Sequence, residues 1–124
     1  MLKILAVAVG GSIGSVGRYL VSTWAAERFG AGFPYGTLIV NVVGCFIIGI
    51  FMTMTTERFI INPYWRLLIT VGFVGGLTTF SSFSYETFRL LEDADMMMAF
   101  YNIALNLALG FFATWLGIGA ARLI

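Results

Sequence analysis

The fold of this chain is decided by one stretch near its middle, Gly72-Phe73-Val74-Gly75-Gly76-Leu77-Thr78-Thr79-Phe80-Ser81-Ser82-Phe83-Ser84. Its three glycines, and then its hydroxyl side chains and two phenylalanines, interrupt a segment that is otherwise apolar enough for a membrane helix. Backbone that faces lipid must keep its hydrogen bonds, so a broken helix is tolerated at membrane depth only against protein or a water-filled cavity. We therefore expect this helix to break near its middle and to mark an ion or substrate site.

The composition around this stretch is that of an integral membrane protein. Hydrophobic residues make up 60% of the 124 residues and charged residues only 10%, whereas an average soluble domain is about 25% charged. Four segments approach or exceed the roughly 20 apolar residues that a spanning helix needs, and they cover about 2–26, 36–56, 65–91 and 96–122. We predict an all-α membrane protein with four transmembrane helices in a single domain, residues 1–124.

The residue types present exclude several kinds of site. The chain has no histidine and only one cysteine, Cys45, which excludes an intrachain disulfide and argues against a thiol–imidazole metal site. Cys45 lies in an apolar segment, as a small buried hydrophobic residue does. No Gly-Lys-Ser/Thr loop is present, so we expect neither a nucleotide nor a nucleic acid as a partner.

The first helix combines packing residues with one internal charge. Gly10, Gly14 and Gly17 follow a spacing that lets two helix backbones approach closely. Arg18 is costly inside a spanning helix and is therefore a functional candidate. The alternative is that its guanidinium extends along the helix to the membrane interface.

Arginine and lysine are divided unevenly between the two sides of the predicted membrane protein. Both termini and the loop near 57–64 lie on one side, and the other two loops lie opposite. The first side carries Lys3, Arg58, Arg66 and Arg122, and the second carries Arg28 and Arg89. This bias favours a cytoplasmic first side only weakly, so insertion in both orientations is an open alternative.

Two further helices carry polar side chains on one face. Thr37 and Asn41 are four residues apart in the second helix and therefore share a face. In the fourth helix, small or polar residues recur at four-residue steps: Asn102, Asn106, Gly110 and Thr114. Such faces are either hydrogen-bonded packing seams between helices or the lining of a polar path, and spacing alone leaves both interpretations open.

The third helix presents aromatic rings beside hydroxyl groups. Phe80 and Phe83 share a face, and Ser81 and Ser84 form a parallel row. Aromatic rings have positive edges, so such rings can favour an anion, although two phenylalanines at helical spacing are commonly plain packing. Carbonyl groups freed where a helix unwinds need new partners and suit a hard cation such as sodium.

These motifs resemble those of the small bacterial fluoride channels of the Fluc (CrcB-type) family. The resemblance covers essentially the whole chain. It rests on Gly75-Gly76-Leu77-Thr78-Thr79-Phe80-Ser81-Ser82-Phe83-Ser84, Gly36-Thr37-Leu38-Ile39-Val40-Asn41, Gly10-Gly11-Ser12-Ile13-Gly14, Arg18 and Glu86. It implies a passive, fluoride-specific channel rather than an enzyme, which exports fluoride across the bacterial inner membrane and limits its toxicity.

The same resemblance implies an architecture and a set of site residues. Two identical subunits would pack antiparallel in a dual-topology homodimer with two fluoride pores. A structural sodium ion at the dimer interface would be held by the backbone carbonyls of Gly75 and Thr78. Phe80, Phe83 and Asn41 would line the pores, with Thr37, Ser81 and Ser82 as nearby polar groups. Arg18 and Glu86 match family positions without a defined role.

The chain departs from the family pattern at two places. Ser82 replaces the second threonine of the usual Thr-Phe-Ser-Thr-Phe motif and keeps its hydroxyl group. Relatives often carry serines along the fourth helix, whereas this chain has Asn106 and Gly110, so the ion-contacting side chains of that helix are undefined. Asn106 and Thr114 are candidates by their stripe positions.

Two other classes of protein compete with the channel hypothesis. A small proton-coupled cation exporter would need a carboxylate inside the first helix, but no acidic residue precedes Glu27 there, and Glu86 is the only plausible intramembrane carboxylate. A non-transporting assembly subunit would account for the glycines but would leave the polar stripes without a use.

Overall fold

The computed structural model describes residues 1–124 and is entirely helical. The elements are α1 (Leu2–Phe29), α2 (Tyr35–Glu57), α3 (Pro63–Arg66), η1 (Leu67–Val74), α4 (Gly75–Leu77), α5 (Phe80–Glu92) and α6 (Met96–Leu123). The elements α3 to α5 follow one another within a single span, Pro63–Glu92. Four helical spans are thus long and apolar enough to cross a membrane, which confirms the prediction of an all-α, multi-pass membrane protein.

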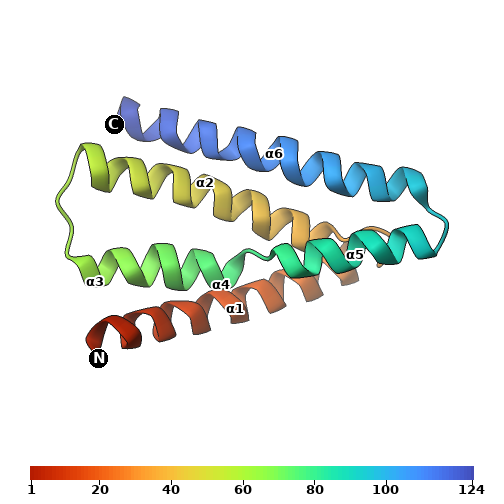
Figure 1. The fold of residues 1–124 in the computed structure, drawn as a ribbon, viewed down its shortest axis with the longest axis horizontal. Coiled ribbons are helices and arrows are strands. Elements are labelled where there is room, and N and C mark those ends of the chain that lie inside the picture. The colour runs from red at the N-terminus through yellow and green to blue at the C-terminus, as the bar shows by residue number, and fades with distance from the viewer.

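The four spans run up and down between the two ends of the molecule (Figure 1). Both termini and the connection from α2 to α3 lie at one end, and the turn from α5 to α6 lies at the other. The helix α2 packs mainly along α6, whereas α1 packs mainly against η1 and α4. The helix α5 makes fewer contacts than either of these pairs, and these contacts are with α6 and α2.

Close contact between backbones holds α1 against the third span. Gly10 and Gly14 are buried, and a Cβ atom at Gly14 would overlap the backbone carbonyl of Phe73. On the facing element, a Cβ atom at Gly76 would lie 2.7 Å from the carbonyl oxygen of Gly11. The glycine spacing in the first helix therefore serves packing, as predicted.

The extended residues of the third span are threonines rather than glycines. Gly72, Gly75 and Gly76 all lie within helical turns, and η1 has the wider turns of a π-helix. Thr78 and Thr79 have extended backbones with φ/ψ values of −84°/157° and −153°/122°. Gly72 and Gly76 therefore bring η1 and α4 close to α1, while the two threonines carry the change in backbone conformation.

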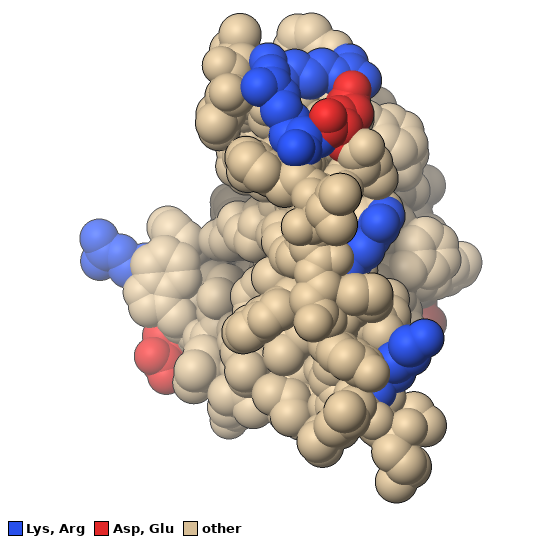
Figure 2. Space-filling model, turned by 90° about the vertical axis from the view of Figure 1, so that its left-hand side faces the viewer, with Lys and Arg blue, Asp and Glu red and all other residues tan.

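Basic side chains gather at the end of the molecule where the termini lie. Figure 2 views this end and shows, at the top, a group of basic side chains next to acidic atoms. Arg122 forms a salt bridge with Glu57 at 3.2 Å, and the guanidinium of Arg58 donates to the Arg122 carbonyl at 2.6 Å. These contacts join the ends of α2 and α6.

Candidate functional site

The Thr78–Thr79 segment separates two helical pieces that have their own ends. The amide and the hydroxyl of Thr78 both donate to the carbonyl of Val74, which closes the α4 end. The hydroxyl of Thr79 accepts the backbone N–H of Ser82 at 3.1 Å, so Thr79 is the N-cap of α5. The direction of α5 is consequently not imposed by hydrogen bonds that continue from α4.

Asn41 of α2 pairs with the backbone of Thr79. Its side-chain oxygen accepts the Thr79 N–H at 2.8 Å, and its side-chain nitrogen donates to the Thr79 carbonyl at 3.1 Å. Both polar groups of this extended residue are therefore satisfied by one side chain, as buried backbone requires. Of the two roles predicted for Asn41, joining helices or lining a polar path, these hydrogen bonds show the first directly.

The amide of Asn41 is the first member of a chain of polar side chains. Its nitrogen also donates to the side-chain oxygen of Asn106 at 3.0 Å. Asn106 in turn donates to the side-chain oxygen of Asn102 at 3.0 Å, and Asn102 donates to the hydroxyl of Thr87 at 2.9 Å. The hydroxyl of Thr87 donates to the carbonyl of Phe83 at 2.8 Å. We call these four side chains, Asn41, Asn106, Asn102 and Thr87, the amide chain.

A groove of about 340 Å³ lies between α2, α5 and α6 beside this chain. It is lined by five of the predicted site residues, namely Asn41, Thr78, Phe80, Phe83 and Asn106. The Phe80 and Phe83 rings lie 5.6 Å apart between centroids with their planes tilted by 59°. Phe80 is 79% exposed, so its ring stands at the open side of the groove.

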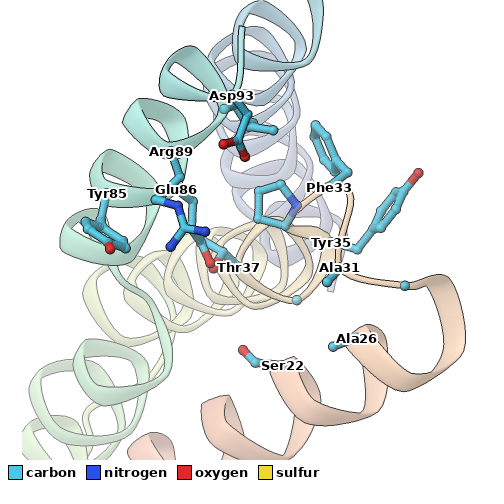
Figure 3. A pocket seen from close by; sticks show the side chains of 14 residues that line it. Ser22, Ala26, Ala31, Phe33, Tyr35, Thr37, Tyr85, Glu86, Arg89 and Asp93 are labelled. Atoms are coloured by element: carbon cyan, nitrogen blue, oxygen red, sulfur yellow. The ribbon is translucent and has the colours of Figure 1, made fainter. Parts of the chain in front are cut away.

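A second cavity of about 270 Å³ contains two other predicted residues, Thr37 and Glu86. Figure 3 shows Thr37, Tyr85, Glu86 and Arg89 on one side of this cavity, with Ser22 and Ala26 of α1 opposite. One carboxylate oxygen of Glu86 is buried and has no hydrogen-bond partner. Thr37 and Glu86 are therefore brought together with each other but do not line the groove.

The remaining predicted residues lie outside both cavities. The Arg18 guanidinium donates through Nε to the carbonyl of Gly76 at 3.1 Å, so it points into the bundle and not along the helix to the interface. Thr114 donates to the carbonyl of Cys45 and joins α6 to α2. The hydroxyl of Ser81 lies 3.2 Å from that of Thr79, and Ser82 contributes its backbone N–H to the Thr79 cap.

Comparison with known proteins identifies the family. A family model described as CrcB-like protein, Camphor Resistance (CrcB), matches residues 5–118. The chain belongs to the CrcB-like family. The resemblance found in the sequence motifs is thereby confirmed.

Several curated relatives match this CrcB-like chain over nearly its whole length. The fluoride-specific ion channel FluC of Sulfurihydrogenibium sp. (strain YO3AOP1) is 49% identical over 100% of both chains. The proteins of the same name from Geobacter metallireducens and Geotalea uraniireducens are 49% and 47% identical, each over 98% of both chains. These relatives are named as ion channels and not as enzymes, which agrees with the prediction.

Sequence reasoning did not select two members of the amide chain of this CrcB-like protein as site residues. Asn102 was recognised as part of the polar stripe, and the structure shows that it is completely buried. Thr87 was not singled out, although it lies one helical turn after Phe83. The stripe was the available signal, because a buried asparagine requires a polar partner on a neighbouring helix.

Asn41→Ala is expected to lower the free energy of unfolding of the CrcB-like protein by about 2 kcal/mol or more, because two backbone groups of Thr79 lose their partner. Ser12→Ala is the control, since the exposed Ser12 hydroxyl donates only to Ala8 within its own helix. This control is expected to change stability by no more than about 0.5 kcal/mol. Denaturant unfolding in detergent measures both, and equal small effects would contradict the pairing.

Proposed function

We propose that this protein is a fluoride-specific ion channel that exports cytoplasmic fluoride by passive electrodiffusion and so limits fluoride toxicity. The observation that carries the proposal is the groove in which the Asn41 and Asn106 amides and the Phe80 and Phe83 rings meet the Thr78–Thr79 segment. The names of relatives that are up to 49% identical over the full chain support the same function.

The groove has the chemistry that a small, strongly hydrated anion requires. Fluoride gives up water only where other hydrogen-bond donors or positive dipoles replace it. In the groove, the positive edges of the Phe80 and Phe83 rings are such dipoles. The hydrogens of the Asn41 and Asn106 side-chain amides are donated to protein oxygens in the subunit, so these amides would have to exchange a partner to bind the anion. A narrow path lined by them suits fluoride better than chloride, which is larger.

No energy source is needed for export in this scheme. Fluoride enters cells as the neutral weak acid and dissociates at near-neutral pH, which leaves the anion inside. An inside-negative potential favours anion exit by about 2.3 kcal/mol per charge for each 100 mV. A passive channel in the bacterial inner membrane is therefore sufficient.

We propose that the Thr78–Thr79 segment breaks the third helix at membrane depth and that a second, antiparallel subunit covers it. The subunit alone leaves the groove open, with Phe80 79% exposed and Phe111 at its edge 74% exposed. The dual-topology homodimer would close two such grooves into two pores. The weak difference in basic residues between the two sides permits insertion in both orientations.

The dual-topology arrangement predicts that each end of the helical bundle is found on both sides of the membrane. Single cysteines added next to Ala31 and next to Ile61 in a Cys45→Ala background provide the labels, because both residues lie in loops at opposite ends. A membrane-impermeant thiol reagent is expected to label both positions in intact cells. Labelling of only one of them would contradict the antiparallel dimer.

We further propose a structural sodium ion between the subunits, held by the carbonyls of Gly75 and Thr78. No group of three His, Cys, Asp or Glu side chains is placed to hold a metal, so oxygen from the backbone is the available ligand. No N–H group donates to the Thr78 carbonyl, because the amide four residues later, that of Ser82, donates to the Thr79 hydroxyl instead. Such a carbonyl suits a hard cation, which would add positive potential near the groove.

Removal of sodium provides a prediction for this site. Purification and reconstitution with N-methylglucamine in place of sodium are expected to abolish fluoride efflux, and micromolar-to-millimolar sodium is expected to restore it. Lithium and potassium, at matched ionic strength, are the controls for general salt effects. Full efflux in vesicles whose sodium content has been measured and is below the protein concentration would contradict the site.

The proposed function is tested by anion efflux from liposomes that contain only the purified protein, with fluoride and chloride electrodes. Rapid loss of fluoride with retention of chloride is the expected result. An absence of fluoride loss from folded protein would overturn the function, and proton-coupled cation export through Glu86 would then be the next hypothesis to measure.

The two rings of the groove provide a prediction for the same assay. Phe80→Ile and Phe83→Ile are each expected to reduce fluoride efflux by about tenfold or more, which corresponds to ~1.4 kcal/mol on the barrier. Phe100→Ile is the matched control, since this exposed ring of α6 does not line the groove. Normal efflux in both ring variants, with the protein folded, would remove the rings from the mechanism.

A further inference from the structure

The helix α5 carries both rings of the groove but has little packing of its own to fix its orientation. Among its residues only Thr87 and Leu90 are buried, and its contacts are limited to α6 and α2. Its first residue, Phe80, follows the extended Thr78–Thr79 segment, so α4 does not set its rotation. Within the subunit, something other than helix continuity and apolar packing must therefore hold the rings in place.

The amide chain links the two ends of the Phe80–Phe83 turn, and its first member determines the direction in which every hydrogen bond is donated. The Thr79 N–H can only donate and the Thr79 carbonyl can only accept, so the Asn41 amide has one permitted orientation. The second hydrogen on the Asn41 nitrogen then points at Asn106, which must present its oxygen. Both hydrogens on the Asn106 nitrogen are consequently directed at Asn102, one at its backbone carbonyl and one at its side-chain oxygen.

The same polarity continues through the buried end of the chain. Because the side-chain oxygen of Asn102 accepts from Asn106, the nitrogen of Asn102 faces Thr87. The Thr87 hydroxyl accepts this bond and gives its own proton to the carbonyl of Phe83. The amide chain therefore begins on the backbone just before Phe80 and ends on the backbone of Phe83, after crossing α2 and α6.

We propose that Asn102 and Thr87 are positioning residues that fix the rotation of α5, and so the placement of the Phe80 and Phe83 rings, through the Asn102–Thr87 hydrogen bond. Neither residue lines the groove. The inference rests on the proposed channel function, since it concerns the rings that this function uses.

Burial makes this hydrogen bond decisive for α5. Asn102 is 0% exposed and Thr87 is 6% exposed, so water does not replace a lost partner for either side chain. If Thr87 lacks its hydroxyl, the Asn102 nitrogen loses the acceptor that the structure gives it. An unpaired buried donor is costly. The Asn102 nitrogen can regain a partner only if α5 rotates or if the Asn102 amide turns, and a turn of this amide also disturbs its hydrogen bond with Asn106.

The test compares Thr87→Val with Thr87→Ser in single-channel recordings of fluoride current in planar bilayers. Valine has nearly the shape of threonine but no hydroxyl, whereas serine keeps the hydroxyl. Thr87→Val is expected to lower the unit fluoride current about tenfold and Thr87→Ser to keep it within about twofold of the original protein. Unit current is independent of the amount of folded protein, so a loss of stability alone does not change it.

Thr70→Val is the matched control for the loss of a threonine hydroxyl. The Thr70 hydroxyl donates to the carbonyl four residues earlier, that of Arg66, as Thr87 does to Phe83, but it has no side-chain partner. This variant is expected to keep the original unit current. A Thr70→Val loss equal to that of Thr87→Val would overturn the inference, because the helix bond alone would then account for both.

A double variant, Asn102→Leu with Thr87→Val, covers the case in which Thr87→Val does not fold. Replacing both partners with apolar side chains removes the donor and the acceptor of this contact together. The Asn106 amide loses the Asn102 side-chain oxygen but keeps the Asn102 backbone carbonyl as an acceptor, so the fold is expected to survive. Its unit current is expected to fall about tenfold as well. A unit current equal to that of the unmodified protein, in folded Thr87→Val or in the double variant, would overturn the positioning role. An absence of fluoride current in the unmodified protein would instead overturn the proposed function.

Discussion

The pairing of the Asn41 amide with the backbone of Thr79 is the interaction on which the remaining structure depends. An extended residue within a membrane-spanning segment exposes an N–H and a carbonyl that neither lipid nor helix can satisfy. One asparagine side chain satisfies both groups at 2.8 and 3.1 Å. Because this pairing exists, Thr79 can remain extended between α4 and α5, and the groove lies beside it.

Two kinds of contact then divide the bundle. Where glycines face one another, as between α1 and the span that contains Gly76, backbones touch and leave little room for adjustment. Where asparagines and threonines face one another, as between α6 and α5, contacts are fewer but directional. Close backbone packing thus fixes α1 against η1 and α4. On the other side of the bundle, polar side chains orient α5 and its two phenylalanines.

Sequence reasoning predicted the elements well and their mutual contacts only in part. Hydropathy and length located four spans, and the Gly-Thr-Phe-Ser stretch led to the correct family. The stretch did not reveal that its glycines pack within helical turns while Thr78 and Thr79 are extended, because both roles favour small residues in a membrane helix. The hydrogen-bond partners of Asn102 and Arg18 could not be predicted either, because residue spacing along one helix gives no information about distances to other helices.

The fixed polarity of the amide chain has a consequence for how such a protein can change over generations. Each member accepts from one neighbour and donates to the next, so a substitution that reverses one role leaves two like groups facing each other in a buried place. Single replacements at Asn102, Asn106 or Thr87 are then penalised, whereas paired replacements that still set one donor against one acceptor are tolerated. These positions lie on two different helices, and we expect their residue types to covary among related sequences.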